Sequence, residues 1–280
     1  MNFEYDYPLF RPPAEANNII LQVTLGCSYN NCSFCSMYKS KKFTIKSLEV
    51  IYKEIDMLST NYPKSTKVFL ADGDALALKS DYLLKILQYL NKKFINLRRI
   101  SLYGSVQNIL SKTSIELEEL YQNNLKLIYF GIESGNDTVL KKITKGVTQT
   151  EIIKSLNIIS KSNIKISATV ILGIGGKEYT NEHIKDTAHI INNTTINYLS
   201  TLQLWLEDDA IDNFYTKFEY FIPLDDLDMI IEQKKFIELL NPKNKVIFRS
   251  NHVSNTLHLS GTIPKDKERL LRKLKYTINN

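Results

Sequence analysis

Three cysteines, Cys27, Cys32 and Cys35, lie within nine consecutive positions and are the only cysteines among 280 residues. Because their number is odd, at least one thiol would stay unpaired in any arrangement of disulfides. The N-terminal residues show neither the basic stretch nor the apolar stretch of a secretion signal. Clustered thiolates are typical ligands of soft metal centres. We therefore predict a metal site here, with a cubane [4Fe-4S] cluster as the preferred guest.

A [4Fe-4S] cluster takes four ligands, so three cysteines leave one iron open to bind a small molecule. Two other interpretations stay open. A structural zinc ion would need a further ligand, but the four histidines all lie far along the chain without a short-spaced pair: His183, His189, His252 and His258. The thiols could also be buried and chemically inert.

The composition favours one large α/β domain, because 43% apolar residues in 280 supply a sizeable core. No apolar run reaches membrane-spanning length, so we expect a soluble, cytoplasmic protein without membrane contact. The formal net charge is +6, and much of the excess lies in the last sixteen residues. This excess is a weak sign of an anionic partner, and a solvated terminal helix explains it equally well.

Strand and helix patterns alternate along the chain. Strands are expected at 18–24, 67–71, 99–103, 126–132, 165–172 and 198–206, and helices at 47–58, 80–94, 114–123, 149–162 and 180–192. Such alternation implies an α/β fold with a parallel sheet and right-handed crossovers. Six units are too few for a closed eightfold barrel, so we predict an open (β/α)6 partial barrel with its site at the carboxyl ends of the strands.

The remaining segments flank this predicted core of residues 18–210. Residues 1–17 are expected to form an extended arm, because Pro8, Pro12 and Pro13 disfavour a helix. Residues 211–280 are expected to form a small α/β extension over the barrel mouth, with a helix at 224–240, a strand at 245–248, a covering loop at 261–264 and a basic helix at 265–276. Glycines in 175–178 predict a flexible loop.

The cysteine loop after a first strand, with Phe34 directly before the last cysteine, resembles the radical S-adenosylmethionine (SAM) enzymes. The resemblance implies a [4Fe-4S] cluster whose open iron is chelated by SAM, and reductive cleavage of SAM to a 5′-deoxyadenosyl radical that abstracts hydrogen from substrate. The family usually has three residues between its first two cysteines. Here there are four, as in variant members, which leaves the subfamily open.

The resemblance also implies cofactor contacts after the later strands. Asp72-Gly73-Asp74 stands where the family carries a Gly-Gly-Glu motif that receives the methionine ammonium group. By the same resemblance, Ser105, Ile171 and Gly173 stand at positions that contact the cofactor. Without the family, Asp74 would be a helix-capping acid in an ordinary turn.

Residues 131–146 resemble the corresponding segment of the branch that contains oxygen-independent coproporphyrinogen oxidase and Elongator-type catalytic subunits. The resemblance assigns Glu133 to the ribose hydroxyls and Lys145 to the methionine carboxylate. The chemistry agrees, since a carboxylate can accept from both hydroxyls and an ammonium pairs with a carboxylate as a point charge. An exposed helical lysine is the alternative for Lys145.

Polar side chains crowd the segment after the strand expected at 245–248. We predict that Arg249, Asn251, His252 and Asn255 face substrate or cofactor, with an ordinary surface turn as the alternative. Without a second set of cysteines, we expect no auxiliary cluster. We also expect no separate cobalamin-binding or tRNA-binding domain.

These observations together predict an oxygen-sensitive radical SAM enzyme that acts on an unidentified small molecule and is reduced by a partner such as flavodoxin or ferredoxin. Peptide and nucleic acid substrates stay open. Two rivals make different predictions. A non-catalytic iron–sulfur sensor or carrier would bind a cluster without a pocket for an adenosyl group, and a zinc-stabilised RNA-binding scaffold would be colourless and stable in air.

Overall fold

The computed structural model describes residues 5–280, so residues 1–4 of the expected arm lie outside the described residues. The chain divides into two compact units. The first unit comprises Met1–Asn30, Met37–Phe130 and Ile158–Lys165, and the second comprises Asn31–Ser36, Gly131–Asn157 and Ile166–Asn280. The cysteine segment is thus shared, because Cys27 belongs to the first unit and Cys32 and Cys35 belong to the second.

The first unit is built on parallel strands that neighbour one another in the order β1, β4, β5 and β6. Their bounds are Ile19–Gln22, Lys67–Ala71, Arg99–Tyr103 and Leu125–Glu133. The register aligns Leu21, Leu70, Leu102 and Ile128 in one row across the strands, and all four are fully buried. Burial of such a row removes apolar surface from water and forms the core of this unit.

Helices separate these strands along the chain. They are α1 (Leu48–Asn61), α2 (Ser80–Lys93), the short α3 (Val106–Leu110) and α4 (Ser114–Gln122), with 3₁₀ turns η1 (Pro13–Glu15), η2 (Ala75–Ala77) and η3 (Ser160–Ser162). A two-residue antiparallel pair, β2 (Thr24–Leu25) and β3 (Thr44–Ile45), joins the two ends of the cysteine segment.

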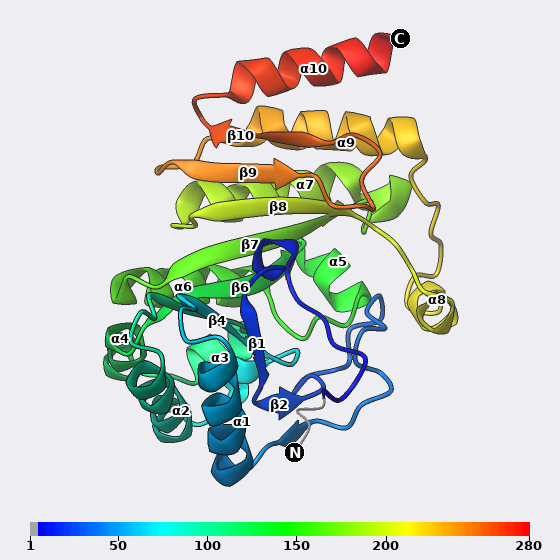
Figure 1. The fold of residues 1–280 in the computed structure, drawn as a ribbon. Helices are drawn as coiled ribbons and strands as arrows, with labels where there is room; N and C mark the ends of the chain where they lie inside the picture. Colours follow the sequence, from blue (N-terminus) through cyan, green and yellow to red (C-terminus); the bar gives the residue numbers. More distant parts are fainter. Residues whose placement is uncertain (1–4) are drawn as a thin grey trace. The chain divides into compact units, whose positions relative to one another are not determined.

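The second unit continues with β7 (Lys165–Leu172), β8 (Tyr198–Gln203) and β9 (Val246–Ser250) in parallel, and β10 (Leu259–Ile263) pairs antiparallel with β9. Its helices are α5 (Asp137–Lys142), α6 (Gln149–Ile159), α7 (Gly176–Asn193), α8 (Asp208–Tyr215), α9 (Asp226–Leu239) and α10 (Lys267–Asn279). Helix α9 packs against both α7 and α10 (Figure 1). No helix of residues 5–280 is long and apolar enough to cross a membrane.

Several helices begin directly after a residue whose side chain caps the helix N-terminus. Ser47 caps α1, Asn136 caps α5 and Asp225 caps α9, each through a side-chain oxygen that accepts from a backbone N–H of the first turn. At α4, Thr113 and Glu116 bond reciprocally in a capping box. Each cap contributes about 1 kcal/mol to stability, which fixes where these helices begin.

The predicted fold class is confirmed: the fold is α/β and its strands are mostly parallel. Among the described residues β1 pairs only with β4 and β10 only with β9, so both are edge strands and the sheet is not closed. The strands predicted at 67–71, 99–103 and 165–172 have the observed bounds. The division at residues 18 and 211 stays a prediction.

Three local predictions were wrong. Residues 175–178 are not a flexible loop, because α7 begins at Gly176, where a positive φ of 60° suits glycine. Residues 261–263 are not a covering loop, because they pair with β9 as part of β10. Strand β8 ends at Gln203 rather than at 206, and the acidic residues after it begin α8, where negative charge favours a helix N-terminus.

Candidate functional site

The cysteine loop, defined here as residues 26–45, leaves β2 and returns at β3. Cys27, Cys32 and Cys35 are half-buried, and none of them forms a disulfide within residues 5–280. The Cys35 N–H donates to the Cys32 carbonyl at 3.4 Å, which makes a tight turn between these two ligands. In the same segment the Ser33 N–H donates to the Ile143 carbonyl at 3.0 Å, and this fixes the turn against the end of α5.

The donor set consists of three half-buried thiols, and thiolates are soft ligands that suit an iron–sulfur cluster. In such a cluster each cysteine binds its own iron. Within residues 5–280, no group of three Cys, His, Asp or Glu side chains is close enough to hold a single metal ion. A lysine lies beside two of these cysteines.

That lysine is Lys145, which forms an ion pair with Glu133 at 3.0 Å between Nζ and Oε1. Burial lowers the pKa of Lys145, but the charges of Glu133, Cys32 and Cys35 outweigh burial and raise it above its usual range. The ammonium therefore stays charged beside these two cysteines. The structure thus brings four predicted site residues together within the second unit.

The backbone conformation of Glu133 directs its carboxylate toward Lys145. Glu133 is the last residue of β6, is 8% exposed, and has a φ of 61°, a left-handed conformation that few residues other than glycine adopt. A Cβ on Gly131 would lie 2.0 Å from Glu133 Oε1, so only glycine leaves room for this carboxylate. Strained non-glycine residues are common at functional sites, and Glu133 fits that pattern.

A second polar group lies in the first unit, beside Cys27. Asp74 is 2% exposed and accepts hydrogen bonds from the Ser28 hydroxyl and the Asn108 amide. Ser105 caps α3 by accepting from the Asn108 N–H at 3.3 Å. Gly73 lies against the Tyr38 ring, and a Cβ there would approach a ring carbon to 2.4 Å. The predicted residues Gly73, Asp74 and Ser105 therefore surround the start of the cysteine loop.

The end of β7 is held by α9. Ile171 is 8% exposed, and Gly173 has a φ of 78°. The Gly173 N–H donates to the buried Glu232 carboxylate at 2.6 Å, and the Thr180 hydroxyl also donates to this carboxylate. Phe34 is half-buried.

The four residues predicted to face substrate have separate environments. Arg249 is exposed and donates to the Phe248 carbonyl at 2.9 Å, and Asn251 is exposed. His252 is half-buried, contacts the Ser254 hydroxyl at 2.8 Å, and has a pKa lowered by burial. Asn255 is 6% exposed and is bonded to backbone groups of β8 through both ends of its amide. Within residues 5–280, none of the four is bonded to Glu133 or Lys145.

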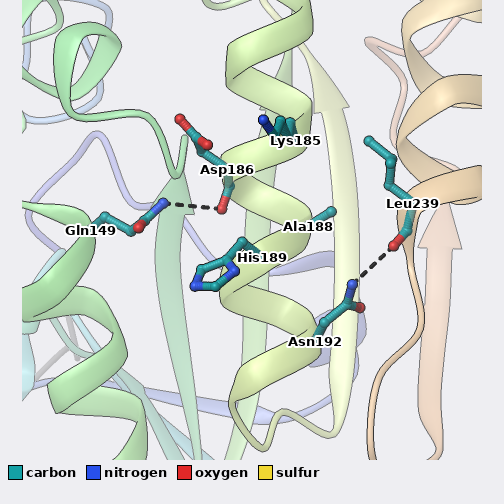
Figure 2. Close-up of a pocket in the computed structure, with 7 residues that line it drawn as sticks. All are labelled: Gln149, Lys185, Asp186, Ala188, His189, Asn192 and Leu239. Carbon is teal, nitrogen blue, oxygen red and sulfur yellow. Dashed lines mark hydrogen bonds between the residues drawn. The ribbon is translucent and has the colours of Figure 1, made fainter.

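A surface pocket of about 440 Å³ lies along α7 (Figure 2). Two of its lining side chains are bonded to backbone carbonyls: Gln149 to that of Asp186 at 3.4 Å, and Asn192 to that of Leu239 at 2.9 Å. None of the predicted site residues lines it.

Sequence reasoning assigned no role to three contributors: Ser28, Asn108 and Glu232. Glu232 had a visible signal, because it is an acid at helical spacing between the apolar residues Met229 and Phe236. Ser28 and Asn108 had none, since they become partners of Asp74 only through the fold.

An α/β partial barrel with a three-cysteine loop after its first strand defines an iron–sulfur enzyme of the radical SAM class. The sequence model of the Radical SAM superfamily matches residues 21–191, and the chain belongs to this superfamily. Enzymes of the superfamily use a [4Fe-4S] cluster and SAM, and they generally need a reductant.

Individual relatives are distant. The chain is 23% identical over 232 residues to the ribosomal protein uS12 methylthiotransferase RimO of Clostridioides difficile, covering 80% of this chain and 51% of RimO. The chain spans about half the length of the curated relatives it matches.

Solved structures share the fold. Coproporphyrinogen III oxidase (HemN) of Escherichia coli has a TM-score of 0.58 at 13% identity over 79% of this chain and 52% of HemN. The hydrogenase maturase HydG of Carboxydothermus hydrogenoformans has a TM-score of 0.53 at 15% identity over 92% of this chain and 57% of HydG. At these identities, the likeness concerns the fold alone.

Proposed function

We propose that Cys27, Cys32 and Cys35 bind a [4Fe-4S] cluster at which SAM is reductively cleaved, and that the resulting radical acts on a small organic substrate. The observation that carries this proposal is the ion pair between Glu133 and Lys145 beside two of the three cysteines. A structural cysteine staple would not require a strained, largely buried carboxylate at this position.

Cys27, Cys32 and Cys35 would hold the cluster, which would supply the electron for reductive cleavage of SAM. The protein's own groups bind and orient. Glu133 accepts hydrogen bonds from the ribose hydroxyls, and Lys145 pairs with the methionine carboxylate. In the free protein these two side chains neutralise each other, so cofactor contacts replace an ion pair instead of exposing an unpaired charge.

The remaining proposed contacts follow from chemistry at the strand ends. Asp74 is a buried acceptor for the methionine ammonium group, and Gly73 allows close approach of the backbone. Ile171 offers an apolar surface to adenine, next to Gly173, while Ser105 and Phe34 line the cofactor. Arg249, Asn251 and His252 are proposed on the substrate side. Asn255 acts through β8, because its amide is bonded there.

A small substrate is favoured because Asp74 in the first unit and Glu133 in the second are each almost wholly buried, and buried acceptors suit a small ligand more than a broad macromolecular surface. The electron comes from a reduced carrier such as flavodoxin or ferredoxin. Cysteines that form no disulfide within residues 5–280 and an oxygen-sensitive cluster favour a reducing compartment such as the cytoplasm.

The direct test is formation of 5′-deoxyadenosine and methionine from SAM by anaerobically reconstituted protein with dithionite. We expect turnover in the wild type, none in Cys32→Ala, and wild-type behaviour in Ser36→Ala. Cluster binding without SAM cleavage would instead support an iron–sulfur sensor or carrier, and colourless protein with bound zinc would support a structural site.

A further inference from the structure

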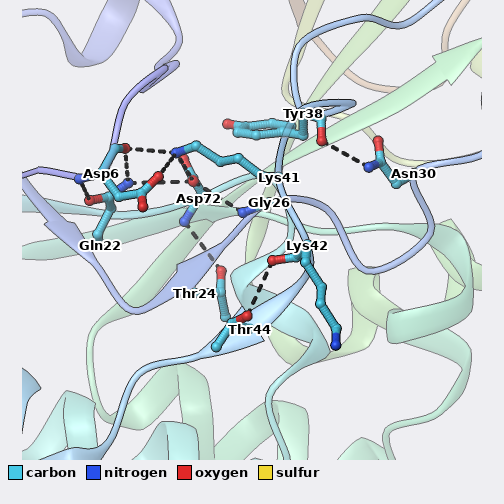
Figure 3. Close-up of polar contacts among 10 residues, drawn as sticks. All are labelled: Asp6, Gln22, Thr24, Gly26, Asn30, Tyr38, Lys41, Lys42, Thr44 and Asp72. Atoms are coloured by element: carbon cyan, nitrogen blue, oxygen red, sulfur yellow. Dashed lines mark hydrogen bonds and ion pairs between the residues drawn. The ribbon is translucent and has the colours of Figure 1, made fainter.

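A buried carboxylate joins the two ends of the cysteine loop to the end of β4. Asp72 directly follows β4 and is fully buried. Its Oδ2 accepts from the Gly26 N–H at 3.2 Å and from Lys41 Nζ at 3.0 Å (Figure 3). Gly26 precedes the first cysteine and Lys41 follows the last, so one carboxylate oxygen contacts both flanks of the segment that carries all three cysteines.

Lys41 uses all of its donors in this contact. Besides Asp72, its ammonium donates to the Asp6 carbonyl at 2.7 Å and pairs with Asp6 Oδ1 at 2.8 Å. An ammonium has three protons, and three acceptors receive them. The side chain of Lys41 is only 6% exposed, so its charge depends on these partners instead of water.

The N-terminal arm is bound at the same place. The Asp6 N–H donates to Gln22 Oε1 at 2.9 Å, and Gln22 Nε2 donates back to the Asp6 carbonyl at 2.8 Å. This reciprocal pair of hydrogen bonds fixes Asp6 to β1. Asp6 in turn presents its carbonyl oxygen and its Oδ1 to Lys41 (Figure 3). The arm therefore contributes directly to the contact between the cysteine loop and β4.

The other ties at the ends of this loop are short backbone pairings and the contact of Tyr38 with Gly73. The β2–β3 pair has two residues on each side, and both residues of β3 are exposed. Backbone bonds from the Asp72 N–H to the Thr24 carbonyl and from the Gly73 N–H to the Gly26 carbonyl, each at 3.1 Å, attach only the outgoing side. On the returning side, the Tyr38 ring packs against Gly73, and the Lys41 ammonium supplies the charged contact to Asp72 at the end of β4.

We propose that Asp72, Lys41 and Asp6 form a clamp that holds the ends of the cysteine loop in register, and that they are positioning residues for the cluster ligands. The proposal rests on the proposed function, since it concerns the loop assigned to the cluster. A cluster needs its cysteines presented together, and outer groups that orient metal ligands typically change metal affinity about 10- to 100-fold when removed.

The test compares Lys41→Met with Lys42→Met in the full-length protein. Methionine keeps the apolar stem and removes the ammonium. Lys42 is exposed and its side chain points away from Asp72 (Figure 3), so its replacement is a matched control. After anaerobic reconstitution, we expect Lys41→Met to lose cluster iron to a chelator about tenfold faster than wild type and Lys42→Met. Lys41→Arg, which keeps the charge and donors, should restore retention.

A second readout needs no cluster. Before reconstitution, amide hydrogen exchange over residues 24–45 should be faster in Lys41→Met than in Lys42→Met, while exchange in α7 and α9 is unchanged. If Lys41→Met does not fold, Asp6→Asn supplies the same comparison, because its carboxylate is 51% exposed. Equal iron loss and equal exchange in the lysine variants would overturn the clamp. A wild type that binds no cluster would refute the proposed function. The hydrogen-exchange comparison would still test whether Asp72, Lys41 and Asp6 form the clamp.

Discussion

The ion pair of Glu133 and Lys145 concentrates opposite charges where two thiols also lie. Each group is largely withdrawn from water, with 10% of the Glu133 side chain and 17% of the Lys145 side chain exposed. Each of these buried charges is stabilised by its partner, or by a ligand group that takes the partner's place. A cofactor that carries ribose hydroxyls and a carboxylate can replace both partners, since its hydroxyls can donate to Glu133 and its carboxylate can pair with Lys145.

Replacing Lys145 by methionine should weaken SAM binding by about 10- to 100-fold, because a hydrogen bond to a charged group contributes about 1.5–3 kcal/mol. The measurement is equilibrium binding of SAM to reconstituted protein without reductant. Lys141→Met is the matched control, since Lys141 is an exposed lysine of α5. Equal affinities in the two variants would remove Lys145 from the site.

His183 lies behind the same strand end. It is fully buried on α7, contacts the Ser134 hydroxyl at 2.8 Å, and burial lowers its pKa from 6.5 to about 4. Between these two pH values the unfolded chain binds the proton and the folded chain does not. Stability from this group is therefore present above pH 6.5 and is lost as the pH falls towards 4.

The loss attributable to His183 is about 3 kcal/mol across that range. We expect the fall in the free energy of unfolding between pH 7 and pH 4.5 to be smaller in His183→Gln than in the wild type. Denaturant unfolding at the two pH values measures this difference. Parallel losses in both proteins would mean that other groups control the acid sensitivity.

At the scale of elements, α9 fixes the segment between β7 and α7. Glu232 of α9 accepts from Gly173 and Thr180, and Met229 fills the space beside Gly173, where a Cβ would lie 2.2 Å from the methionine methyl group. Burial raises the pKa of Glu232 from 4.5 to about 7, although both hydrogen bonds oppose the shift. The folded chain thus binds a proton between these pH values that the unfolded chain releases.

It follows that stability from Glu232 is present below pH 4.5 and is lost as the pH rises through about 7. Glu232→Gln keeps an acceptor for Gly173 without the charge. We expect this variant to gain about 1–3 kcal/mol over the wild type at pH 8 and to match it at pH 4.5. Thermal or denaturant unfolding measures the gain. Glu238→Gln, an exposed site on the same helix, should show no such pH-dependent gain.

The regular elements were predictable where local signals agreed. Ser47 and the apolar spacing behind it predicted α1, and the β-branched run at 165–172 predicted β7 with its observed bounds. Strand β10 was missed because Gly261 and Pro264 read locally as a turn, whereas pairing with β9 decides its conformation. The Lys41–Asp72 contact joins residues 31 positions apart and has no local signal.

The Glu133–Lys145 pair was reached through the family resemblance, since neither residue alone distinguishes a binding group from a surface one. The strain at Glu133 could not be predicted, because it depends on Gly131 and on the end of β6.

At the scale of the whole molecule, the net charge of +6 has a partly structural explanation. Lys267 donates to the carbonyls of Glu238 and Leu240 at 2.7 and 2.8 Å. Further along α10, Arg269 and Lys273 donate to backbone carbonyls at 2.8 and 3.0 Å. Basic groups of the terminal helix thus hold it to the second unit, which favours the structural reading of this charge over an anionic partner.

The central claim is that the three cysteines hold a cluster to which SAM binds. Electron paramagnetic resonance of the reduced, reconstituted protein, recorded with and without SAM and beside Cys32→Ala, tests it most directly. We predict the signal of a reduced [4Fe-4S] cluster that changes on addition of SAM and is absent from the variant. A colourless protein with stoichiometric zinc, or a cluster signal indifferent to SAM, would contradict the account.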